Sequence, residues 1–116
     1  PIAEVLPVKI MNYDDRIDTP EGVSPYIVDK EHPIVAGIEE PWPRYLGYNY
    51  VEEKPGTHVI MKIRDSVGLA VGEYGKGRSV AFATDCLPHW ALPEVLEWQY
   101  YSLFWKNILN WLTEKR

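Results

Sequence analysis

The residues best suited to chemistry lie in one short string, DCLPHW at 85–90, which follows an apolar run at 79–84. The apolar run indicates a strand, and in open α/β sheets ligands bind just beyond the carboxyl ends of the strands. An imidazole titrates near neutral pH, so His89 can act as a general base if Asp85 or Glu94 orients its ring. We therefore take Asp85 and His89 as candidate catalytic residues. The alternative is structural, with the aspartate capping a turn and the histidine packing on its aromatic neighbour.

The single cysteine of the chain, Cys86, lies in the same string. A thiol becomes a nucleophile when a nearby imidazole lowers its pKa, and His89 is only three residues away. Cysteines at the ends of strands are more often small buried hydrophobic residues. Cys86 is therefore a weaker catalytic candidate, and a packing role stays open.

A second polar group, Asp14, Asp15 and Arg16, lies in a stretch at 12–25 that is rich in Pro, Gly and Asp. We expect a long loop there. Two adjacent carboxylates can bind a ligand or, together with Asp85 or a histidine, a cation. They can equally pair with the arginine or cap a turn. No tight His/Asp/Glu spacing motif is present, so the sequence predicts no metal site.

Asn49 ends the string LGYN and is a further ligand-binding candidate, although its amide can equally hold the loop backbone through hydrogen bonds. The connector Gly75-Lys76-Gly77 lacks the longer glycine spacing of a nucleotide-binding loop and separates two predicted strands. It therefore predicts a hairpin turn. No pattern in the chain points to a cofactor.

The composition restricts the class of protein. The chain has 116 residues, of which 46% are hydrophobic, which is enough for one domain with a modest core. A net charge of −5 argues against nucleic-acid binding and against a polybasic membrane anchor. No apolar run approaches the roughly 18 residues that span a bilayer. A lone cysteine fits a reducing compartment, so we predict a cytoplasmic protein.

The expected elements alternate between strands and helical segments. Patterning and turn residues predict strands at 4–11, 48–52, 57–63, 69–74 and 79–84, and one helical turn within 31–38. A C-terminal helix is expected to begin at Pro93 and to end at 114–116. Its apolar residues cover most of its circumference, so we expect a missing segment or a partner chain to pack on it. A homo-oligomer is one such arrangement.

Several strings occur in a characteristic order. They are LPV at 6–8, YDDR at 13–16, TPEG at 19–22, HPI at 32–34, LGYN at 46–49, GEYGKGR at 72–78, TDCLPHW at 84–90 and EW at 97–98. With this order and spacing the chain resembles a bacterial family of cytoplasmic proteins described as "putative glutamine amidotransferase". Members of the family are roughly twice as long as this chain. The resemblance covers nearly all of the chain and places it in the C-terminal half.

The resemblance implies an α/β fold in which residues 1–116 are one domain. That domain would be the C-terminal part of a flavodoxin-like, class I glutamine amidotransferase-like sandwich, with a β-hairpin and a closing C-terminal helix. The nucleophilic cysteine of such enzymes would lie in the missing N-terminal half, which thereby becomes the main expected partner. The family string His-Pro-Glu is replaced here, because His89 follows Pro88 and Glu94 comes five residues later. Two hypotheses follow, a hydrolase or transferase and a non-catalytic ligand-binding or oligomer-forming domain.

Overall fold

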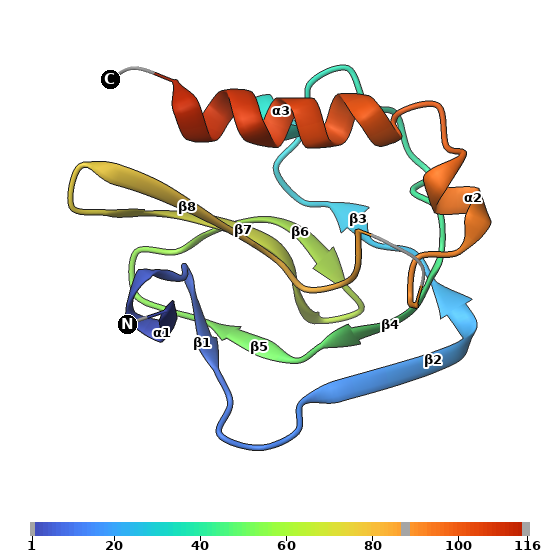
Figure 1. Ribbon diagram of the computed structural model, residues 1–116, viewed down its shortest axis with the longest axis horizontal. Coiled ribbons are helices and arrows are strands. Elements are labelled where there is room, and N and C mark those ends of the chain that lie inside the picture. The colour runs from blue at the N-terminus through green and yellow to red at the C-terminus, as the bar shows by residue number, and fades with distance from the viewer. Residues whose placement is uncertain (1, 87–88, 115–116) are drawn as a thin grey trace.

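The computed structural model describes residues 2–86 and 89–114 and has three layers (Figure 1). The central layer is a four-stranded sheet in the order β3-β6-β7-β8. Its strands are β3 (Tyr26–Ile27), β6 (His58–Ile63), β7 (Ser66–Tyr74) and β8 (Gly77–Phe82). Helix α3 (Tyr101–Thr113) crosses one face of this sheet. The 3-10 turn η1 (Pro33–Val35) lies beside it, bonded through Asn107.

Two-stranded ribbons form the layer on the other side of the sheet. Strand β1 (Val8–Ile10) pairs with β5 (Val51–Glu53), and β2 (Arg16–Val23) pairs with β4 (Tyr45–Asn49). Strands β4 and β5 follow each other along one line below the sheet (Figure 1). All ladders between these strands are antiparallel. Tight turns suffice for such ladders, whereas parallel strands need long crossover connections.

The side chains of β7 supply both cores because successive residues of a strand face opposite sides of the sheet. Leu69 and Val71 face the helices and pack with Phe104 and Ile108 of α3. Ala70 faces the ribbons and belongs to a smaller cluster around β1 and β5. The sheet is therefore covered on both faces, which explains why β7 is buried without a break from Val67 to Val71.

The predicted strand at 4–11 is wrong in its first half. The structure has a short helix, α1 (Ile2–Val5), before strand β1. The Nζ atom of Lys54 donates to the carbonyl oxygens of Ala3 at 2.6 Å and Leu6 at 2.7 Å, and thus satisfies the end of this helical turn. A tertiary contact across about 50 residues of sequence therefore decides the local structure, and no local pattern carries that information.

The predicted long loop at 12–25 is also wrong, because most of it is strand β2. Residues 16–18 pair regularly with 47–49, and the register then shifts before Val23 meets Tyr45. Pro20 lies inside this irregular part, where the ladder needs no amide donor. Buried Thr19 donates its hydroxyl hydrogen to the carbonyl oxygen of Tyr45 at 3.2 Å and holds the irregular part in place. Proline and glycine here mark a bulged edge strand instead of a loop.

The predicted C-terminal helix begins at Pro93 as expected, but it is two helices. Helix α2 (Pro93–Leu96) ends before residues 97–100, and α3 follows at a different angle (Figure 1). Trp98 lies in the break, 4.6 Å from the buried ring of Trp42, which also contacts Phe104 at 4.9 Å. Packing around that one indole outweighs the helical continuity that the sequence pattern indicates. Leu109 is 62% exposed, so α3 is less enclosed than predicted.

The remaining elements agree with the sequence apart from their ends. The hairpin β7–β8 turns at Gly75, whose φ is 59°, and Tyr74 pairs with Gly77. His32 is extended and precedes η1, as expected for a residue before proline. The predicted strand at 48–52 is divided between β4 and β5. The chain is thus a mixed α/β structure, and none of the helices in its described part is long and apolar enough to cross a membrane.

Candidate functional site

The structure brings Asp85 and His89 together in the loop that follows β8. The Nδ1 atom of His89 lies 3.2 Å from Oδ2 of Asp85, and the histidine side chain is 69% exposed. The same carboxylate oxygen accepts the backbone N–H of Trp90 at 3.0 Å, which fixes its direction. A carboxylate that is held in this way can orient an accessible imidazole for proton transfer. The packing alternative is also realised, since the His89 and Trp90 rings lie 5.5 Å apart.

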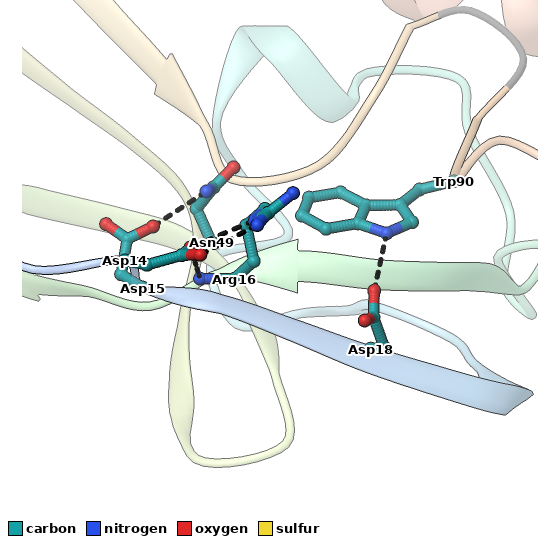
Figure 2. A network of polar contacts seen from close by, with 6 residues as sticks. All are labelled: Asp14, Asp15, Arg16, Asp18, Asn49 and Trp90. Atoms are coloured by element: carbon teal, nitrogen blue, oxygen red, sulfur yellow. Dashed lines mark hydrogen bonds and ion pairs between the residues drawn. The ribbon is translucent and has the colours of Figure 1, made fainter.

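The loop that contains Asp85 and His89 is anchored by Trp90, a residue that is 5% exposed. Figure 2 shows its ring lying along the β2–β4 ribbon, with the indole nitrogen donating to Oδ1 of Asp18 at 3.2 Å. The carbonyl oxygen of Trp90 accepts the N–H of Leu46 at 2.8 Å. Gly47 makes room for the ring, because a Cβ there would lie 2.5 Å from Cε2 of Trp90 and 2.7 Å from the carbonyl oxygen of Ile17.

The candidate ligand-binding residues pair with one another at the start of β2 (Figure 2). Arg16 donates from Nε and Nη2 to the two oxygens of Asp14 at 2.9 and 2.7 Å. These bonds lower the pKa of Asp14 to about 2. Asn49 donates from Nδ2 to Oδ1 of Asp15 at 2.8 Å, and its backbone N–H donates to the carbonyl oxygen of Ala83 at 2.7 Å. The contacts favour a structural role, in which these residues join the ribbon to the end of β8.

Cys86 and Glu94 are not drawn into the Asp85–His89 contact. Cys86 is exposed, and its carbonyl oxygen accepts the hydroxyl hydrogen of Tyr101 at 2.7 Å. Glu94 accepts from Nη2 of Arg44 at 2.9 Å, and this bond lowers the pKa of Glu94. Among residues 2–86 and 89–114, no three potential ligands of His, Cys, Asp or Glu type come together around a metal position.

Sequence reasoning missed a second histidine–carboxylate pair. The Nε2 atom of His58, on β6, lies 2.6 Å from Oδ2 of Asp29, and this bond lowers the pKa of Asp29. His58 also lines a cavity of about 590 Å³ that lies between the α1–β1 segment, β7, the start of β8 and the end of α3. The two partners are 29 positions apart in the sequence, so they form no local motif.

This cavity does not belong to the Asp85–His89 site. It adjoins Arg78 and Ser79 near the start of β8, whereas Asp85 follows the other end of that strand. Most of its polar side chains bond to their own neighbours, and Lys54 for example donates to the carbonyl oxygens of Ala3 and Glu4 in α1 and of Leu6 after it. Buried Ser79 is the exception, because its hydroxyl has no partner in the described parts of the chain.

Comparison with known proteins identifies the family. The model of the family described as "Putative glutamine amidotransferase" matches residues 1–114, so the chain belongs to this family and the resemblance predicted from the sequence is confirmed. The structure is similar to "Cytoplasmic Protein STM3548 from Salmonella typhimurium", with 37% sequence identity and a TM-score of 0.93, over 98% of this chain and 46% of that one. No protein with a curated description is significantly similar to the chain.

A second solved structure gives the same result. "Cytoplasmic Protein STM1381 from Salmonella typhimurium LT2" shares 39% sequence identity with a TM-score of 0.92, over 97% of this chain and 46% of that one. The chain therefore spans less than half the length of either Salmonella protein.

Proposed function

We propose that the chain forms the later part of an amidotransferase-like hydrolase or transferase, whose nucleophile lies in an N-terminal half. The observation that carries this proposal is the 3.2 Å contact between Asp85 and the exposed ring of His89 beyond the end of β8. In such an enzyme His89 takes the proton of the nucleophilic thiol, and Asp85 holds the ring in the required tautomer. Membership of the amidotransferase family supports this assignment.

The same proposal extends to the fold and the cellular compartment. An upstream half would supply a flavodoxin-like sheet, and α3 would close the resulting sandwich. The shared segment covers 46% of each Salmonella structure, which leaves room in those proteins for the further half that is proposed here as the partner. A cytoplasmic location is supported by the descriptions of those two proteins. Neither nucleic acid nor a membrane surface is proposed as a partner.

The test is ammonia release from L-glutamine by the full-length protein that contains this chain. We expect His89→Asn to lower kcat by about 10²–10⁴-fold, the usual contribution of a general base, without loss of folding. Asp85→Asn should lower kcat as well, because the ring then loses its orienting carboxylate. His58→Asn is the matched control and should leave kcat unchanged, since it removes an imidazole at a distance from this loop. Glutaminase activity that survives His89→Asn contradicts the assignment.

A specific observation favours the second candidate, a non-catalytic ligand-binding or oligomer-forming domain. Glu94, the glutamate nearest to His89 in sequence, is engaged by Arg44 at 2.9 Å. The Cys-His-Glu arrangement of class I amidotransferases is therefore not reproduced by these two residues. If the folded wild-type protein releases no ammonia from L-glutamine, the amidotransferase proposal fails and the binding domain is favoured.

A further inference from the structure

Four side chains from separate segments contact one another in a row on the α3 side of the sheet. His58 of β6 lies 5.8 Å from His32, whose ring lies 5.5 Å from that of Trp111 on α3. The guanidinium carbon of Arg78 on β8 then lies 4.5 Å from the centre of the Trp111 ring. We call these four residues the His32 column. It joins the sheet, the turn η1 and the C-terminal part of α3 through contacts between tilted rings.

The central ring of the column has a bond that depends on its protonation. Nδ1 of His32 accepts the backbone N–H of Ile34 at 3.2 Å and caps η1. That nitrogen must be unprotonated to accept, so the bond requires a neutral ring with its proton on Nε2. The capped turn is tied to the helix as well, because Asn107 of α3 donates to the carbonyl oxygens of Ile34 at 3.1 Å and Ala36 at 3.0 Å.

The charges around His32 oppose its protonation. Burial lowers the pKa of His32 most, and the adjacent His58 and Arg78 lower it further, while Asp29 acts in the opposite direction. Asp29 is already engaged by His58 at 2.6 Å. Arg78 has a neighbouring carboxylate in Glu114 at 3.4 Å, and it also donates to the carbonyl oxygen of Trp111 at 2.8 Å. A proton on His32 thus adds a cation between two basic groups.

We propose that the His32 column is a proton-operated latch that holds η1 and the C-terminal part of α3 on the sheet while His32 is neutral. A proton on Nδ1 replaces the acceptor by a donor, so the bond from Ile34 breaks and η1 loses its cap, which weakens the contact of the turn with α3 although the Asn107 bonds remain. Trp111 and His58 also line the cavity of about 590 Å³, so a loosened column lies at the α3 wall of that cavity. Acidification therefore acts on a site distant from Asp85.

The test is hydrogen exchange of the 116-residue chain at pH 7.5 and pH 5.0, with rates divided by the intrinsic chemical rate at each pH. We expect amides of η1 and of the second half of α3 to exchange about five-fold faster at pH 5.0, the size expected for one lost capping bond. Amides of β6 and β7 should keep their protection. Equal acceleration in every element would show global unfolding and would overturn the proposal.

Two variants separate the latch from other titrations. His32→Asn keeps a side-chain acceptor for the N–H of Ile34 but cannot take a proton, so its exchange should lose the pH dependence. His89→Asn is the matched control, removes an exposed histidine outside the column and should keep the wild-type response. A response that persists in His32→Asn, or that disappears in His89→Asn, contradicts the latch.

A measurement on the wild-type chain decides the question even if His32→Asn does not fold. Nitrogen-15 NMR of the His32 ring should show the Nε2–H tautomer at pH 7.5 and the doubly protonated ring at pH 5.0. A ring that is already charged at pH 7.5, or still neutral at pH 5.0, overturns the proposal.

Discussion

One position without a side chain sets the geometry of the candidate site. Gly47 lets the Trp90 ring lie directly against β4. Trp90 in turn fixes the loop that contains Asp85 and His89, because its backbone N–H donates to Asp85. The indole N–H to Asp18 bond then fixes the rotation of the ring. The orientation of the candidate base therefore depends on a residue that takes no part in the proposed chemistry.

We predict that Gly47→Ala lowers the free energy of unfolding by about 1–3 kcal/mol, the usual cost of forcing an extra methyl group into a packed site. The new methyl group would meet the Trp90 ring, which is held by its bond to Asp18, and the carbonyl oxygen of Ile17, which is held in the β2–β4 ladder. Urea unfolding measures the change. Gly77→Ala is the matched control, since its nearest contact is an ordinary 3.5 Å to the carbonyl oxygen of Tyr74. Equal losses in both variants would contradict the role assigned to Gly47.

Separation along the chain explains which polar pairs could be predicted from the sequence. Asp85 and His89 are four residues apart in one string, so their contact could be anticipated. Asp29, which follows β3, reaches His58 because β3 pairs with β6. Neither segment contains a local sequence pattern that predicts this pairing. The Trp90–Asp18 hydrogen bond joins residues 72 positions apart, and no local sequence pattern predicts it either.

At the scale of elements, the packing of α3 on the sheet holds the larger core together. Phe104 is buried between Trp42, Phe82 and Trp105 at ring distances of 4.9, 5.4 and 5.2 Å. Leu109 lies on the opposite, exposed side of the same helix. Full burial on α3 is limited to Phe104 and Ile108, and half-buried side chains such as Trp105 and Leu112 pack beside them.

We predict that Phe104→Ala lowers the free energy of unfolding by about 3–5 kcal/mol, because it removes a buried ring and leaves a cavity. Leu109→Ala should change it by less than about 0.5 kcal/mol, as is usual for exposed positions. Guanidinium unfolding followed by circular dichroism provides both values. Comparable losses at the two positions would show that α3 is enclosed on both sides, for instance by a second chain.

The elements that the sequence failed to predict share one physical cause. Strand β2 is held by its pairing with β4 and by a buried Thr19 bond, so Pro20 and Gly22 do not break it. The interruption between α2 and α3 follows from the packing of Trp98 on Trp42. In both regions a distant partner outweighs local propensity, whereas the hairpin at Gly75 depends on local backbone geometry and was predicted correctly.

At the scale of the whole molecule, stability should be highest at neutral pH and fall in two stages on acidification. Folded His32 binds a proton less readily than the unfolded chain, so its contribution decreases as the pH falls below about 6.5. Asp29 has a lowered pKa, so its contribution persists above about pH 4 and is lost as the pH falls further. Asp14 also has a lowered pKa, but it is exposed, so solvent screening weakens its contribution to the stability of the fold.

Urea midpoints measured between pH 8 and pH 3 test this profile. His32→Asn should remove the upper stage, and Asp29→Asn should reduce the lower one. A profile that rises between pH 6.5 and pH 5 would contradict the direction assigned to His32.

The last prediction concerns self-association, which the exposed apolar side chains favour. Ile2, Val5 and Tyr74 are exposed on α1 and at the end of the β7–β8 hairpin, where the Tyr74 hydroxyl bonds to Glu4. Because apolar surface in water favours association, we expect the 116-residue chain to form oligomers at concentrations on the order of tens of micromolar, as measured by light scattering.

Ile2→Lys should shift the equilibrium toward monomer, and Leu109→Lys serves as the comparison on α3. A monomeric wild-type chain contradicts the prediction. Association of this chain but not of a longer protein that contains it would show that the upstream half covers the same surface.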